Sequence, residues 1–391
     1  MKKDTLFIDA GRDKKWIGNA VNPKLVRASS IVFDTYAEME QNRQFGVETY
    51  GRDGTSTTFA FQSAMAQLDN AAGCFAYPCG TAAITASLLS FLSAGDHLLM
   101  VDSVYQPTRN FCTGTLARLG IETSYYDPLL GADIKNLLRN NTKVIFLESP
   151  GSLTMEVQDV PSIVKVAQQN SIVTLIDNTY ATPFNFKPLN FGVDVSIQSV
   201  TKYINGHSDI MLGIACANEA SWPQLDQRSY ELGLCASVDD IYTALRGIRT
   251  LGVRLCQHQK NALLVAKWLE QRPEVDHIRH PAFASCPGHA EFERDFDGST
   301  GLFSFVLNKG NQNTVAAMLE GMHHFKMGFS WGGFESLVIS PSNLAAKRTV
   351  TAWSAPGPLV RLHVGLEDPD DLIEDLSKGF DRFNAHYNQE S

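Results

Sequence analysis

A lysine stands directly after an apolar run in the segment SVTKYINGHSDIMLG, residues 199–213. Lys202 follows the stretch VDVSIQSV, which has the composition of a buried strand, and Ser199 and Thr201 stand beside it. Lysine is among the residues that are least often found inside a protein unless they are paired or modified. An amine at the end of a core strand therefore indicates a chemical role for Lys202.

Other candidate residues also follow apolar runs. Asp177 ends the run IVTLID, and Gly80 and Thr81 stand where a short apolar run gives way to helical spacing. Free backbone N–H groups and the dipole at a helix start favour a phosphate. A pyridoxal phosphate enzyme needs such a phosphate seat, a lysine that forms a Schiff base with the cofactor aldehyde, and an acid that pairs with the pyridinium nitrogen.

Each of these residues also has an ordinary structural explanation. A strand-end aspartate is usually a cap or turn residue, and Gly80 with Thr81 could form a tight turn with an N-cap. Lys202 could extend to solvent, and Tyr105 in DSVYQPTRN could be a packing aromatic rather than a ring that stacks on a cofactor. Their joint occurrence in the expected order favours the cofactor site.

The elements that would position these residues form an alternating pattern from about residue 56. Short apolar runs typical of strands are separated by stretches with helical spacing, which predicts crossover units and a mainly parallel sheet in an α/β fold. In doubly wound sheets, ligands bind at the carboxyl ends of the strands, where the candidate residues fall. The runs in question are HLLMVD, IETSYYD, TKVIFLESP, IVTLIDNTY and VDVSIQSVTKY.

Three parts of the chain differ in pattern. Residues 1–55 show no clear amphipathic helix and are predicted to form an N-terminal arm that contacts a neighbouring subunit. Residues 56–250 are predicted to form the cofactor domain. Residues 251–391 are predicted to form a smaller α+β domain, with a long helix over 250–273, strands in GLFSFVLN and LVRLHVGL, and a final amphipathic helix.

Composition limits the possible partners. The 391 residues carry a net charge of −9, which argues against a nucleic acid or an anionic membrane surface, because both require basic patches. No apolar stretch is long enough to span a membrane, and the N-terminus lacks the apolar core of a signal peptide. Seven scattered cysteines predict reduced thiols in a cytoplasmic protein, and Cys74 and Cys79 lack a second pair that would complete a zinc site.

A second motif overlaps the lysine segment. Ser199 and Lys202 fit S-x-x-K, the nucleophile motif of β-lactamases and penicillin-binding proteins. Those enzymes also need S-D-N and K-T-G elements, which the sequence lacks, and their serine opens a helix rather than ending an apolar run. A serine acyl-enzyme is therefore the weaker alternative, and it would show covalent labelling at Ser199.

The lysine segment resembles the cofactor-lysine signature of the Cys/Met-metabolism pyridoxal phosphate enzymes, the cystathionine synthase and lyase family. The blocks YGRDGTST, FLESPGSLTMEV, LIDNTY, RGIRTLGVRL and SWGGFESL match further family blocks in order, so the resemblance covers essentially the whole chain. It implies a fold type I architecture, pyridoxal 5'-phosphate as cofactor, a small amino-acid substrate, and a homotetramer built from two dimers.

The resemblance assigns roles at the matching positions. It implies that Lys202 carries the cofactor, that Asp177 pairs with the pyridinium nitrogen, and that Tyr105 stacks on the ring and assists proton transfer. The residues for which it implies phosphate contacts are Gly80, Thr81, Ser199 and Thr201.

Further roles follow from the arm and from the last third of the chain. The resemblance implies that Tyr50 and Arg52 reach the phosphate of a neighbouring subunit, and that Tyr50 also contacts the substrate. It implies that Arg361 binds the substrate α-carboxylate, a task suited to a guanidinium because it can bond a carboxylate bidentately. Ser330 and Trp331 are expected to line the substrate side of the site.

Two departures from the family pattern bear on the reaction. The γ-synthases and γ-lyases usually read ESPxNP and SLGG, whereas this chain has Ser152 in ESPGSL and Trp331 in SWGG. Both differences favour β-elimination of L-cystathionine to L-homocysteine, pyruvate and ammonia, with other cysteine S-conjugates as further substrates. Trp331 could also be a core residue beside a Gly-Gly turn. A γ-lyase or γ-synthase is the alternative, and a cofactor-binding protein without turnover is a second one.

Overall fold

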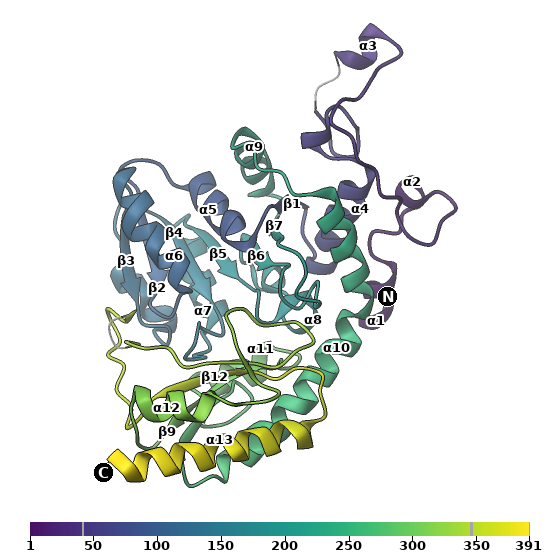
Figure 1. Cartoon of the computed structure of the whole chain (residues 1–391). Coiled ribbons are helices and arrows are strands. Elements are labelled where there is room, and N and C mark those ends of the chain that lie inside the picture. The colour runs from purple at the N-terminus through teal and green to yellow at the C-terminus, as the bar shows by residue number, and fades with distance from the viewer. Residues whose placement is uncertain (41–42, 345–346, 391) are drawn as a thin grey trace.

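The computed structural model describes residues 1–40, 43–344 and 347–390, and two β-sheets organise them (Figure 1). The strands between Gly73 and Ala217 form a seven-stranded sheet, and those between Val275 and His363 belong to a five-stranded sheet. The arm around α3 extends away from both sheets (Figure 1). The α/β class that the alternating pattern predicts is confirmed.

The large sheet has the strand order β1-β7-β6-β5-β4-β2-β3. Strands β2 to β6 run parallel, whereas β7 is antiparallel to its neighbours β1 and β6. The prediction of a mainly parallel sheet is therefore confirmed. The strands are β1 (Gly73–Tyr77), β2 (His97–Val101), β3 (Glu122–Tyr126), β4 (Thr142–Glu148), β5 (Val173–Asp177), β6 (Val195–Ser199) and β7 (Gly213–Ala217).

Strand β7 is absent from the sequence-based prediction. Its residues, GIACA, are small and apolar without alternation, so they give no periodic signal. Both faces of the sheet are covered at β1 and β7. On β1, Cys74 and Ala76 pack against α4 (Ser56–Asp69). The alternate residues Phe75 and Tyr77 lie on the opposite face, in the cluster that contains α5 (Gly80–Phe91).

Most of the remaining helices of this part connect consecutive strands along the chain, as the crossover pattern requires, and α9 follows the last strand, β7. The segment predicted as one helix after Tyr105 is α6 (Gln106–Phe111) followed by a π-helical turn, η2 (Cys112–Leu116). The others are η3 (Gly131–Leu137), α7 (Val160–Gln169), α8 (Thr182–Asn185), η4 (Pro188–Phe191) and α9 (Trp222–Glu231).

The small sheet has the order β10-β11-β12-β9-β8 and is antiparallel except for the pair β10-β11. A buried cluster that includes Phe303, Phe305, Phe380 and Phe383 joins it to the C-terminal helix, which stabilises this part through apolar burial. Its elements are β8 (Val275–Arg279), α11 (His289–Asp295), β9 (Leu302–Leu307), α12 (Gln312–Leu319), β10 (Lys326–Met327), β11 (Leu337–Ile339), β12 (Leu359–His363) and α13 (Pro369–Glu390).

One long helix, α10 (Val238–Glu270), connects the two parts. It begins at Val238 rather than at Thr250, so the predicted start was wrong. Gly247 hides the start of the helix in the sequence, because glycine is a weak helix former. The packing nevertheless requires glycine there, since an added Cβ would lie 2.6 Å from the carbonyl oxygen of Asn205. The predicted domain boundary at residue 250 falls inside this helix; the divisions at residues 55 and 250 stay predictions.

The described residues of the arm contain short helices that the sequence did not indicate: α1 (Lys3–Asp9), α2 (Lys14–Ile17), α3 (Tyr36–Met39) and the 3-10 helix η1 (Gly51–Asp53). Its start is fixed to α10, because the Arg249 guanidinium donates to the carbonyl oxygens of Phe7, Ile8 and Ala10. Apolar side chains further along are exposed, among them Val32 and Tyr36. Such exposed apolar residues suit a contact with another surface.

Within the described ranges, no helix is both long and apolar enough to cross a membrane. The same residues contain no group of three or more histidine, cysteine or acidic side chains that could hold a metal ion.

Candidate active site

A cavity of about 350 Å³ lies at the carboxyl ends of β4, β5 and β6, and residues of the C-terminal part line its other side. The position agrees with the rule for ligand sites in such sheets. The structure brings together most of the residues assigned from the sequence; those that line this cavity are Gly80, Thr81, Tyr105, Ser152, Asp177, Ser199, Thr201, Lys202, Ser330, Trp331 and Arg361.

Lys202 lies in the turn that follows β6. Its amine donates a hydrogen bond of 2.5 Å to the hydroxyl oxygen of Ser330. Burial, aided by the charge of Arg361, lowers the pKa of Lys202 to about 8, although Asp177 opposes the shift. A lysine with this pKa has a sizeable neutral fraction near neutral pH, which is the form that acts as a nucleophile or base.

Two carboxyl groups end adjacent strands. Asp177 on β5 is in register with Glu148 on β4. Asp177 accepts a 2.9 Å hydrogen bond from the backbone N–H of Thr179, and burial raises its pKa. A positive ring nitrogen placed against Asp177 would offset this cost of burial, because an opposite charge favours the ionised carboxylate.

Glu148 fixes the residue that was assigned to ring stacking. Its Oε2 accepts a 2.8 Å hydrogen bond from the backbone N–H of Tyr105, which precedes α6 at the mouth of the cavity. Burial, followed by the charge of Asp177, raises the pKa of Glu148 well above its usual range. Glu148 was missed by the sequence-based assignment, although its place at the end of the run TKVIFLE was an available signal.

The start of α5 packs tightly against the end of β6. A Cβ added at Gly80 would lie 2.6 Å from the Cβ of Ser199, so only glycine allows this approach. The backbone N–H of Ser199 donates to the hydroxyl of Thr179 at 2.8 Å. A helix N-terminus beside hydroxyl side chains is a suitable seat for a phosphate. Thr201 differs from the others, because its hydroxyl already exchanges hydrogen bonds with the backbone of Leu212.

The C-terminal part contributes the opposite wall. Arg361 on β12 donates a 3.0 Å hydrogen bond to the carbonyl oxygen of Ser330, and burial lowers its pKa to about 10. Ser330 has φ of +83°, a conformation that costs energy for a residue with a side chain and is concentrated at functional sites. An added Cβ at Gly332 would lie 2.8 Å from the backbone nitrogen of Tyr203, so this loop rests on the lysine turn.

Trp331 is half-buried, and it acts both as a packing residue and as a residue of the cavity wall. Its ring packs on Tyr203 with centroids 5.4 Å apart, and it also lines the cavity. The Lys202 amine lies 5.6 Å from the centroid of the Trp331 ring. The indole therefore faces the amine and restricts the space beside it.

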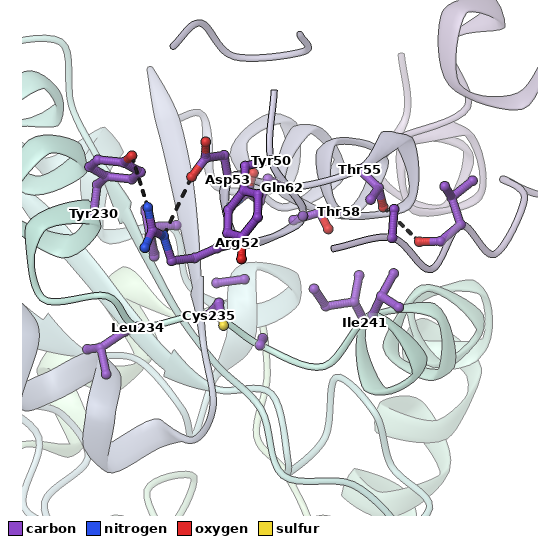
Figure 2. Close-up of a pocket in the computed structure, with 18 of the residues that line it drawn as sticks. Tyr50, Arg52, Asp53, Thr55, Thr58, Gln62, Tyr230, Leu234, Cys235 and Ile241 are labelled. Atoms are coloured by element: carbon purple, nitrogen blue, oxygen red, sulfur yellow. Dashed lines mark hydrogen bonds and ion pairs between the residues drawn. The ribbon is translucent and has the colours of Figure 1, made fainter. Parts of the chain in front are cut away.

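Tyr50 and Arg52 do not line this cavity. They border a separate cavity of about 280 Å³ beside α9, shown in Figure 2. Arg52 donates a 3.2 Å hydrogen bond to the hydroxyl of Tyr230 and lies 3.7 Å from the carboxylate of Asp53. Tyr50 is 45% exposed. The structure describes one chain, so a role for these residues in a neighbouring subunit stays a prediction.

The chain belongs to the Cys/Met metabolism PLP-dependent enzyme family, whose model matches residues 4–381. It is 48% identical over 386 residues to a cystathionine beta-lyase of Haemophilus influenzae, covering 97% of this chain and 98% of that protein. It is also 48% identical over 389 residues to a cystathionine beta-lyase of Escherichia coli, with the same coverage.

Solved structures agree with this assignment. A cystathionine gamma synthase from Xanthomonas oryzae, in complex with aminoacrylate and cysteine, superposes with a TM-score of 0.90 at 31% identity and covers 98% of this chain and 99% of its own. Pyridoxal phosphate is thus the cofactor of the family to which this chain belongs.

Proposed function

We propose that this chain is a cystathionine β-lyase, which cleaves L-cystathionine to L-homocysteine, pyruvate and ammonia. Three relatives that are named cystathionine beta-lyase are each 48% identical to this chain over nearly its whole length. The observation that carries the proposal is the cavity in which Lys202, with its lowered pKa, faces Asp177, Arg361 and Trp331. The same site would accept other cysteine S-conjugates.

The residues present fit the cofactor. Gly80 and Thr81 at the start of α5 line the cavity, where their backbone N–H groups would hold a phosphate, and Asp177 would supply the acid for the ring nitrogen. Thr81, Ser199 and Thr201 line the same cavity. Pyridoxal phosphate supplies an electron sink that stabilises negative charge at the substrate Cα.

The side chains of this chain would divide the work as follows. Arg361 would bind the substrate α-carboxylate and so orient the Cα–H bond. The neutral amine of Lys202, held by Ser330, would take the Cα proton. Lys202 or Tyr105 would then give a proton to the sulfur that leaves Cβ. The remaining three-carbon fragment would hydrolyse to pyruvate and ammonia.

The decisive assay is the identification of products from L-cystathionine with the purified holoenzyme. Pyruvate together with homocysteine is the expected result. Cysteine together with 2-oxobutyrate would assign the chain to the γ-lyase branch, which shares Lys202, Asp177 and Arg361. Bound cofactor without turnover of any tested thioether would favour a protein that has lost catalysis.

We further propose that the enzyme is a homo-oligomer, a tetramer built from two dimers, in which Tyr50 and Arg52 complete the site of a neighbouring subunit. Two observations support this proposal: apolar residues of the arm are exposed, and Tyr50 and Arg52 line another cavity of their own chain rather than the one that contains Lys202. A cytoplasmic location stays a prediction.

A further inference from the structure

We propose that Lys347 recognises a carboxylate on the leaving-group half of the substrate, within a second cavity that adjoins the cofactor pocket. The ligand class is a thioether amino acid with a second carboxylate at the far end of the sulfur substituent. Because such a substrate would be cleaved by the lyase activity proposed above, this inference rests on that function and adds a specificity-determining residue to it.

The second cavity has a volume of about 620 Å³ and shares walls with the first. The residues that line both cavities are Tyr105, Ser152, Leu153, Phe329 and Arg361. A substrate whose α-carboxylate is held by Arg361 can therefore extend its sulfur substituent from the first cavity into the second.

Much of the second cavity is apolar, which suits a methylene chain and a thioether sulfur. Leu153, Met327, Phe329 and Leu344 contribute to this surface. The charged side chains on its walls must therefore account for any charge recognition; they are Asp102, Lys347, Arg348 and Arg361.

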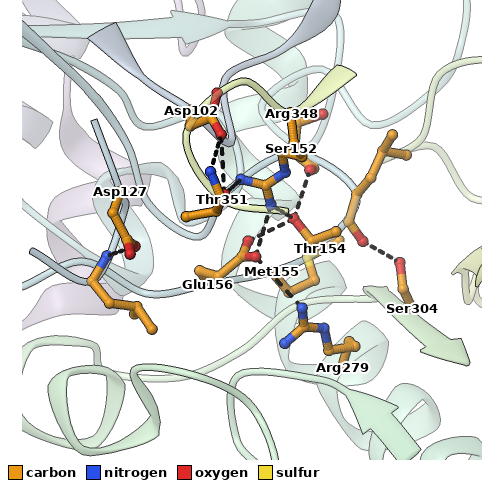
Figure 3. A network of polar contacts seen from close by, with 12 residues as sticks. Asp102, Asp127, Ser152, Thr154, Met155, Glu156, Arg279, Ser304, Arg348 and Thr351 are labelled. Carbon is orange, nitrogen blue, oxygen red and sulfur yellow. Dashed lines mark hydrogen bonds and ion pairs between the residues drawn. The ribbon is translucent and has the colours of Figure 1, made fainter. Parts of the chain in front are cut away.

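Asp102 is fully occupied by contacts within the protein, of which Figure 3 shows those with Thr351. Its carboxylate accepts hydrogen bonds from the backbone N–H groups of Thr349, Val350 and Thr351 at 3.0–3.2 Å, and Arg109 donates to it at 2.7 Å. The Asp102 side chain is completely buried. It therefore has no charge to offer to a ligand, and its role is to fix the chain at 349–351.

Arg348 is likewise neutralised. It forms a 2.7 Å ion pair with Glu156 and also donates to the hydroxyl of Thr154, and only 4% of its side chain is exposed. Arg279 also lies 3.5 Å from the carboxylate of Glu156. Figure 3 shows both guanidinium groups beside Glu156. A buried and paired guanidinium of this kind is a structural element rather than a ligand-binding group.

Lys347 differs from Asp102 and Arg348. It is half-buried on the cavity wall, and its amine forms no hydrogen bond or ion pair with any residue in the described part of the chain. The anchored segment 348–351 directly follows it, so its backbone is held at the cavity. Arg361 and Lys347 thus provide one available cation each for a substrate with two carboxylates.

The test compares two substrates that differ only in the far carboxylate, S-(3-carboxypropyl)-L-cysteine and S-propyl-L-cysteine. In the holoenzyme with Lys347→Met, kcat/KM for the carboxylated substrate is expected to fall about tenfold, chiefly through KM, because a charge-assisted hydrogen bond is lost. The value for S-propyl-L-cysteine should stay unchanged, and Lys347→Arg should retain most of the preference. Lys326→Met is the matched control, because Lys326 is exposed on β10 and lines neither cavity.

Each result decides the proposal. An equal loss with both substrates, or no loss with the carboxylated one, would overturn the role of Lys347 while leaving the lyase activity intact. If the unmodified holoenzyme releases pyruvate from neither compound nor from L-cystathionine, the proposed function itself fails. The selective loss in Lys347→Met alone supports the proposal.

Discussion

The amine of Lys202 and the hydroxyl of Ser330 lie 2.5 Å apart, although 128 positions separate them in the chain. Lys202 follows a strand of the large sheet, whereas Ser330 belongs to a loop of the C-terminal part that also carries Trp331. The candidate base is therefore oriented by one part of the molecule and attached to the other. Its position depends on how the two parts pack together.

Lys202→Ala is expected to lower kcat for L-cystathionine by about 10³-fold or more, because it removes the proposed base and the cofactor attachment together. Lys165→Ala, at an exposed position on α7, should leave kcat unchanged. Steady-state assays of pyruvate release provide the measurement. Near-normal turnover in Lys202→Ala would remove the basis of the proposed mechanism.

Asp177→Asn should lower kcat about 10²-fold with little change in KM. The amide keeps the shape of the side chain but cannot hold a proton on the cofactor ring nitrogen by charge, and this interaction matters most when negative charge develops at Cα. A variant in which KM changes while kcat does not would contradict the assignment.

Activity should increase with pH between about 7 and 9. Burial lowers the pKa of Lys202 to about 8, and raising the pH through this value converts the ammonium into the neutral amine that can accept a proton. Because the charge of Arg361 contributes to the lowered pKa, Arg361→Gln should move the midpoint of the kcat profile to higher pH. A profile that is flat over this range would argue against Lys202 as the titrating base.

Mixing two inactive variants tests the proposed subunit interface. Arg52→Ala and Lys202→Ala should each be nearly inactive as pure proteins. Coexpressed chains should recover on the order of a quarter of normal activity, since random pairing gives hybrid dimers with one intact site each. No recovery in hybrids, once their formation is verified by mass, would indicate that Arg52 serves its own chain.

Asp102→Asn should destabilise the folded protein by about 3–5 kcal/mol, because Arg109 would remain buried without its counter-charge. Urea unfolding at pH 7 measures the difference. Burial acts to raise the pKa of Asp102, but its hydrogen bonds together outweigh burial and hold the pKa far below its usual range. The stabilisation from ionised Asp102 is therefore present above about pH 4 and is lost on acidification. The difference in the free energy of unfolding between Asp102→Asn and the original protein should therefore become smaller below that pH. Glu231→Gln, which breaks the exposed pair with Arg228, should leave the urea midpoint nearly unchanged.

The strands that carry the site were predictable from the sequence. Burial on both faces gives β4 and β5 mostly apolar runs, and in β6 apolar residues alternate with Ser196 and Gln198. Because these strands are parallel, the residues at their carboxyl ends could then be assigned to the same edge of the large sheet. The lysine segment was specific enough to indicate the cofactor and the family.

Contacts that depend on distant packing were not predictable. The hydrogen bond from the backbone N–H of Tyr105 to Glu148 depends on how β2 and β4 are aligned in the sheet, and no local sequence pattern encodes this alignment. The conformation of Ser330, with positive φ, is unusual for serine and is imposed by its surroundings. The start of α10 was hidden by Gly247, which is required there for close packing rather than for flexibility.

The continuous helix α10 has consequences for unfolding. At 1.5 Å per residue its 33 residues extend about 50 Å, with Leu245 and Ile248 in the core beside α4 and Val265 and Leu269 in the core of the small sheet. Cutting the chain at residue 250 would sever this helix and expose apolar surface on both fragments. The two sheets should therefore melt as one cooperative unit, and neither half is suited to production as a separate protein.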